Sequence, residues 1–118
     1  MTVKSDLDLG RIPLLEGMRS QSEKTWQVLA PRYGVTNPNP PWKTSLTAMC
    51  DCLGNSGMIG AVELRHAEDE FGDALYSEVP DPERHLLAVA HTMLDRGLVT
   101  EGDLASRMSA VRSRLEAV

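Results

Sequence analysis

The chain has 118 residues, of which 42% are hydrophobic and 4% aromatic, and its formal net charge is −5 at pH 7. This length corresponds to one small domain, whose core must come mainly from aliphatic and methionine side chains. The acidic balance and the absence of consecutive basic residues argue against a nucleic-acid or anionic-membrane binder. No apolar run approaches the roughly 20 residues that cross a bilayer. The start of the chain shows no secretory hydrophobic region, so we expect a cytoplasmic protein.

The first part of the chain predicts an arm, one helix and a linker. Residues 1–15 are polar and then interrupted by proline, which favours an irregular arm. Residues 16–33 are expected to form a helix that ends at Gly34. Three prolines within residues 35–41 favour an extended linker. We therefore expect residues 1–41 to precede a separate helical domain at residues 42–118.

Two further helices are expected in the middle of the chain. The first covers residues 42–53 and ends at a turn, Gly-Asn-Ser-Gly, over residues 54–57. The second covers residues 60–71, where apolar positions recur at helical spacing and charged residues fill the other face. Residues 72–80 are expected to form a loop.

The two cysteines, Cys50 and Cys52, lie two positions apart on the first of these helices. Side chains at this spacing point about 200° around the helix axis from each other. They therefore cannot form a relaxed disulfide or bind one metal ion together. The three histidines are scattered, and there is no second, correctly spaced ligand pair. The sequence predicts no metal site on this chain and two buried or half-buried thiols in a reducing compartment.

The segment that starts at Asp81 carries the signals of a complete helix. Asp81 is expected to cap the helix, with Pro82 at its first position, where the missing N–H costs nothing. Gly97 is the expected left-handed stop. The predicted buried face is Leu86, Val89, Ala90, Met93 and Leu94.

The last helix is expected to run from Thr100, its cap, almost to the end, with Asp103 at the capping-box position. The connection is about three residues long, so the final two helices are expected to pack as an antiparallel pair. The alternative is that the last helix contributes to an interface between chains. Its apolar stripe is Leu104, Met108, Val111 and Leu115. Altogether, the sequence predicts an all-α fold of about five helices with no repeat.

Several short motifs follow one another in a fixed order. They are Trp42, Cys50-Asp51-Cys52, the turn at Gly57, Glu63-Leu64-Arg65-His66, Glu83-Arg84-His85-Leu86-Leu87 and Leu94-Asp95-Arg96-Gly97-Leu98-Val99-Thr100. This set resembles the N-terminal helical half of nitrile hydratase β subunits and the corresponding subunit of thiocyanate hydrolase. The resemblance extends over residues 42–115.

The resemblance implies a subunit of a heteromeric enzyme that hydrates nitriles to amides, a hydro-lyase whose isolated chain is expected to be inactive. In that family a low-spin Co(III) or Fe(III) ion is held by a Cys-x-x-Cys-Ser-Cys loop of the α subunit. Nothing in this chain resembles that loop, so the cofactor is expected on a metal-binding α partner. Arg65 matches an arginine that hydrogen-bonds the oxidised cysteines of the partner, a task that suits a planar guanidinium. Without the resemblance, Arg65 would be an ordinary surface arginine.

Two departures from the family refine these expectations. The family's β subunit continues into a β-barrel domain, which is expected here as a separate subunit. The family also has tyrosines near Asp81 and His85 that line the substrate channel, and only Glu83-Arg84 is kept here. We therefore expect Asp81, Arg84 and His85 to line a channel for a bulkier or more polar nitrile. His85 or His66 are candidates for a proton relay, although an interface position for His85 and an exposed one for His66 are the simpler interpretations.

Other functions are also compatible with the sequence. Nitrile hydratase accessory proteins are similar in length and helical pattern, but they carry tryptophans after the turn equivalent to Gly57, where this chain has Met58-Ile59-Gly60. A stand-alone helical adaptor that dimerises through its last helix is a third possibility. A helix-turn-helix DNA binder is least favoured, because the chain has no basic recognition helix.

Overall fold

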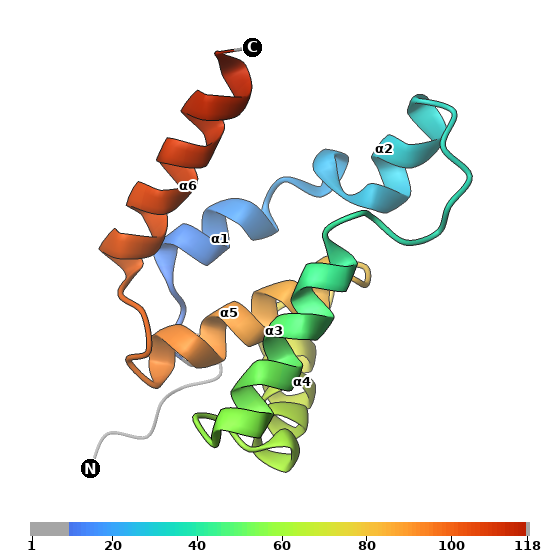
Figure 1. Ribbon diagram of the computed structural model, residues 1–118. Helices are drawn as coiled ribbons and strands as arrows, with labels where there is room; N and C mark the ends of the chain where they lie inside the picture. The colour runs from blue at the N-terminus through green and yellow to red at the C-terminus, as the bar shows by residue number, and fades with distance from the viewer. Residues whose placement is uncertain (1–9, 118) are drawn as a thin grey trace.

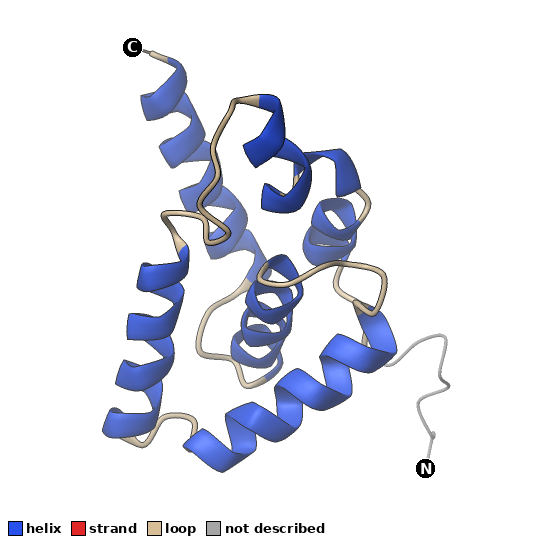
Figure 2. Ribbon diagram, turned by 90° about the vertical axis from the view of Figure 1, so that its right-hand side faces the viewer, coloured by secondary structure: helices blue, strands red, loops and turns tan. Residues whose placement is uncertain are grey.

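The computed structural model describes residues 10–117, which form an all-α fold (Figure 1). Figure 2 shows only helices and loops over these described residues, so the predicted fold class is confirmed. None of the described helices is long and apolar enough to cross a membrane. The elements are α1 (Pro13–Arg19), the short 3-10 helix η1 (Ser22–Lys24), α2 (Trp26–Arg32), α3 (Lys43–Ser56), α4 (Ala61–Leu75), α5 (Glu83–Asp95) and α6 (Glu101–Glu116).

The N-terminal part differs from the prediction of one continuous helix over residues 16–33. The chain instead forms α1, η1 and α2 in succession. Residues 20–24 are polar and have no apolar face to bury, so the apolar groups on either side pack as separate short helices. α1 begins earlier than predicted, with Pro13 in its first turn, and Gly34 ends the region in the predicted left-handed conformation (φ 71°). Most of the predicted irregular arm, residues 1–9, lies outside the described residues.

The middle helices are both longer than predicted. α3 continues to Ser56 and ends at Gly57, whose φ of 78° is the left-handed conformation that glycine adopts readily. α4 continues to Leu75, so the predicted loop over residues 72–80 begins only at Tyr76.

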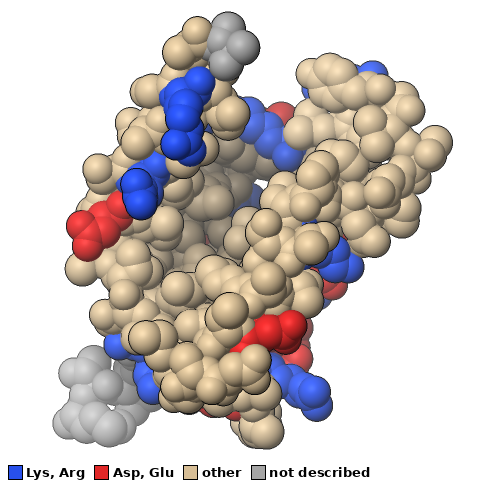
Figure 3. Space-filling view, in the orientation of Figure 1, with Lys and Arg blue, Asp and Glu red and all other residues tan. Residues whose placement is uncertain are grey.

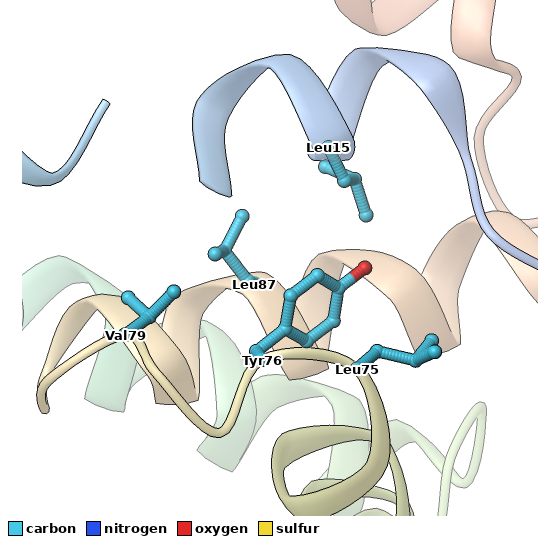
Figure 4. Close-up of a cluster of buried hydrophobic side chains, with 5 residues drawn as sticks. All are labelled: Leu15, Leu75, Tyr76, Val79 and Leu87. Atoms are coloured by element: carbon cyan, nitrogen blue, oxygen red, sulfur yellow. The ribbon is translucent and has the colours of Figure 1, made fainter. Parts of the chain in front are cut away.

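Within residues 10–117 the core consists of two clusters of buried side chains, one on each side of α5. Figure 4 shows the first cluster, in which the Tyr76 ring lies between α1 and α5. Its members are Leu15, Leu75, Tyr76, Val79 and Leu87. The second joins α3, α4 and α5 through Leu46, Leu53, Ile59, Leu64 and Val89. α5 is therefore the central helix of the fold.

The predicted apolar face of α5 contacts both core clusters but leaves out most of the helix's buried residues. Val89 is buried as expected, but Leu87, Ala88, His91 and Thr92 are buried as well. A single apolar stripe is typical of a helix with one neighbour, whereas α5 has α1 on one side and α3 and α4 on the other. His91 is accommodated because its Nδ1 is hydrogen-bonded to the Tyr76 hydroxyl at 2.8 Å.

The predicted cap of α5 is wrong. The helix begins at Glu83, its N-cap is Pro82, and no side chain of the described residues caps it. The Asp81–Pro82 peptide is cis, and the N–H of Arg84 donates to the Pro80 carbonyl at 3.0 Å. The Arg84 N–H, in the first turn of α5, is thus satisfied by a backbone carbonyl of the preceding loop, and Asp81 stays exposed.

The end of the chain confirms the local signals but not the predicted packing. Gly97 has φ 74°, and the Asp103 N–H donates to the Thr100 hydroxyl at 3.1 Å, as expected. However, no described residue of α6 is buried, and Figure 1 shows α6 turning away from α5 toward α1. The antiparallel packing is wrong because α1, α3 and α4 already occupy the apolar faces of α5. The division of the chain at residue 41 stays a prediction.

Candidate functional site

A polar pocket of about 360 Å³ lies where the start of α5 meets α4 and the start of α3. All three predicted channel residues, Asp81, Arg84 and His85, line it together. The full lining is Lys43, Glu68, Asp69, Asp73, Asp81, Pro82, Arg84 and His85. Carboxylates outnumber cationic side chains in this lining, so the pocket favours positive charge.

Arg84 is held in the wall of this pocket by contacts within the chain. Its Nε donates to the Val79 carbonyl at 2.8 Å. Its aliphatic stem packs on Gly72 of α4, where an added Cβ would stand 3.4 Å from Arg84 Cδ. Arg84 therefore ties the loop before α5 to α4, and it contributes a fixed charge to the pocket.

His85 pairs with residues from two other helices. Its Nε2 lies 2.6 Å from Glu68 Oε1 of α4 and 4.0 Å from Cys50 Sγ of α3. Burial raises the pKa of the Cys50 thiol, and the charges of Glu68 and Asp51 raise it further. The sequence did not associate Cys50 or Glu68 with His85, because only the packing of three helices brings them together.

The other predicted residues lie on the surface. Arg65 is exposed on α4 and does not line the pocket, and its side chain makes no hydrogen bond or ion pair with another described residue. His66 is also exposed, in line with its simpler interpretation. Cys50 is half-buried as expected, but Cys52 is exposed, because it faces away from the core on the same helix.

A second, more apolar surface lies between α1 and α6. A groove of about 510 Å³ is lined by Pro13, Leu14, Gly17, Met18, Gln21, Ala105, Met108, Ser109 and Arg112. Along α6, Met108, Val111 and Leu115 are 37%, 40% and 70% exposed. Figure 3 shows that the molecule is hollowed between α6 and α2 and that the visible wall of this hollow is mostly uncharged.

Comparison with known protein families gives a match over most of the chain. Residues 31–117 match the family model described as nitrile hydratase beta subunit, N-terminal. The matched region begins near the end of α2, covers well over half of the chain and includes the polar pocket, Arg65 and α6. No curated protein and no solved structure matched the chain.

Proposed function

Since the chain belongs to the family of nitrile hydratase β-subunit N-terminal regions, we propose that it works as a subunit of a heteromeric nitrile hydratase, which hydrates a nitrile to an amide. The family match is the observation that carries this proposal. The catalytic Co(III) or Fe(III) ion would reside on an α subunit. Residues of this chain do not fit such a three-cysteine centre, since it has two cysteines, one exposed and one half-buried, that diverge on α3.

The surface of α6 supports a heteromeric assembly. A 16-residue helix with an apolar stripe and no buried residue is incomplete on its own, because such a stripe is stabilised by burial against a neighbour. The groove between α1 and α6 continues this surface. We propose this face as the docking site of the metal-bearing subunit. A separate β-barrel subunit stays a prediction.

Arg65 is proposed to act on the partner's metal centre as a positioning residue. Its guanidinium makes no hydrogen bond with another described residue, so all of its donors are available to a partner. Within the assembly it would donate to the oxygens of oxidised cysteine ligands and hold them in place.

The pocket of Asp81, Arg84 and His85 is proposed to form part of the wall of the substrate channel. Its lining is polar and charged, which supports a larger or more polar nitrile over a small aliphatic one. Faster turnover of small aliphatic nitriles than of heteroaromatic ones by the assembled enzyme would contradict this preference.

Co-expression with candidate Cys-x-x-Cys-Ser-Cys partners tests the assignment. A complex that retains near-stoichiometric cobalt or iron and converts a nitrile to its amide would support it. Purification of the chain alone, away from every such partner, would contradict it, and a transient complex would instead indicate an accessory role.

Arg65→Lys should lower kcat in the complex, because the ammonium group of lysine cannot donate the two parallel hydrogen bonds that a guanidinium donates. Arg32→Lys, at the exposed end of α2, is the matched control.

A further inference from the structure

Three side chains that can bind a metal meet at the edge of the polar pocket. Cys50 comes from α3, Glu68 from α4 and His85 from α5, and all three are half-buried. One sulfur, one oxygen and one nitrogen atom from them lie within 4.8 Å of one another. This juxtaposition is independent of the family match, and it differs from the sequence-based expectation of no metal site.

We propose that Cys50, Glu68 and His85 form a binding site for a divalent transition-metal ion of the zinc or cobalt type. Thiolate and imidazole ligands favour such ions, whereas magnesium and calcium take oxygen ligands. One thiolate, one carboxylate and one neutral imidazole balance the two positive charges of the ion. On binding, the ion replaces the Cys50 thiol proton, which passes to the solvent. It also displaces the proton between His85 Nε2 and Glu68 Oε1, so that the neutral imidazole binds through Nε2 and carries its one proton on Nδ1.

The distances in the structure are close to those that coordination requires. Tetrahedral zinc with ordinary bond lengths places its sulfur and nitrogen ligands about 3.5 Å apart and its nitrogen and oxygen ligands about 3.4 Å apart. The Cys50 Sγ to His85 Nε2 distance of 4.0 Å must shrink slightly, and the His85 Nε2 to Glu68 Oε1 distance of 2.6 Å must open. Both changes require only side-chain rotations, for which there is room because the three residues lie on separate helices and each is only half-buried.

The pocket beside these three residues supplies access for the ion, room for a water ligand and negative charge. Glu68 and His85 both line it, so its space of about 360 Å³ gives an ion access and admits water as a fourth ligand. Asp69, Asp73 and Asp81 add negative charge, which Lys43 and Arg84 only partly offset. Three protein ligands and one open position are typical of exchangeable or catalytic sites rather than of closed structural ones.

Cobalt titration of the chelator-treated full-length chain tests the site by absorption spectroscopy. We expect one Co²⁺ per chain, with a thiolate-to-cobalt charge-transfer band and the visible bands of tetrahedral cobalt. Cys50→Ser should abolish the charge-transfer band, whereas Cys52→Ser should retain it. Glu68→Gln and His85→Asn should each weaken Co²⁺ binding at least tenfold, and the exposed controls Glu70→Gln and His66→Asn should not.

A second measurement uses the unaltered chain, so it does not depend on the folding of a variant. Zn²⁺ should protect Cys50, but not Cys52, from alkylation, as read by mass spectrometry of the peptides. Zn²⁺ should also raise the unfolding temperature, because the ion would link α3, α4 and α5. Absence of the charge-transfer band, or equal alkylation of Cys50 with and without Zn²⁺, would overturn the proposal. Either result leaves the subunit assignment unaffected, because no partner is involved.

Discussion

The Glu83 carboxylate of α5 accepts a hydrogen bond from the backbone N–H of Trp26, the first residue of α2, at 2.6 Å. Thr25 is the N-cap residue of α2, but its side chain makes no capping hydrogen bond. A similar contact occurs at α1, where the Leu14 N–H donates to Glu101 Oε2 of α6 at 2.9 Å. The two short N-terminal helices are thus capped by carboxylates of the C-terminal half, which satisfy free N–H groups and complement the helix dipole.

Glu83→Ala is expected to loosen α2. Loss of an N-terminal cap costs about 1 kcal/mol, so the free energy of unfolding in urea should fall by roughly this amount. Hydrogen–deuterium exchange should increase most within Trp26–Arg32. Glu70→Ala, which removes an exposed carboxylate on α4, is the control. Unchanged exchange in α2 would show that Glu83 does not hold this helix.

The two kinds of cap show what the sequence can and cannot predict. Thr100 and Asp103 are three residues apart, so their hydrogen bond follows from a local pattern. Glu83 and Trp26 are 57 residues apart, and no local pattern links them. The predicted cap at Asp81 failed for a related reason, because the loop before α5 packs into the core through Tyr76 and Val79, which no local pattern predicts.

The candidate site also combines residues that are close in sequence with residues that only the fold brings together. Asp81, Arg84 and His85 are close in sequence and were expected to act together, and the pocket contains all three. Cys50 and Glu68 reach His85 only through the packing of α3 and α4 on α5. Sequence spacing predicts that Cys50 and Cys52 point to different sides of α3, where one is half-buried and the other exposed, but it gives no information about ligands on different helices.

Tyr76→Phe is expected to destabilise the core without changing its packing. Tyr76 and His91 are both buried, and the substitution removes only the hydroxyl that is hydrogen-bonded to His91 Nδ1. The expected loss is about 1 kcal/mol in the free energy of unfolding, measured by urea denaturation. Tyr33→Phe alters an exposed tyrosine and should have no effect. Equal stability of the two variants would show that the buried hydrogen bond contributes nothing net.

Glu78→Gln is expected to reduce the stability of the protein near neutral pH but not in acid. The hydrogen bond from Arg19 lowers the pKa of Glu78 in the folded chain, so the charged form is favoured by folding. Such a contribution is fully present above the ordinary glutamate pKa of about 4.3 and is lost as the pH falls through the lower folded value. The difference in unfolding temperature between wild type and variant should therefore shrink on acidification. The pair is exposed, so the effect should be small and should decrease further in high salt. A difference that is independent of pH would contradict this assignment.

Replacing the outer apolar residues of α6 separates folding from assembly. Val111 and Leu115 are exposed, so Val111→Glu with Leu115→Glu should change the free energy of unfolding of the isolated chain by no more than about 0.5 kcal/mol per site. The same pair should abolish co-purification with the proposed metal-bearing partner, because it places two charges in an apolar interface. Ser113→Glu lies on the other side of the helix and should retain the complex. Persistence of the complex in the double variant would show that the partner docks elsewhere. A large loss of stability in the isolated chain would show instead that this stripe serves the fold of the chain itself.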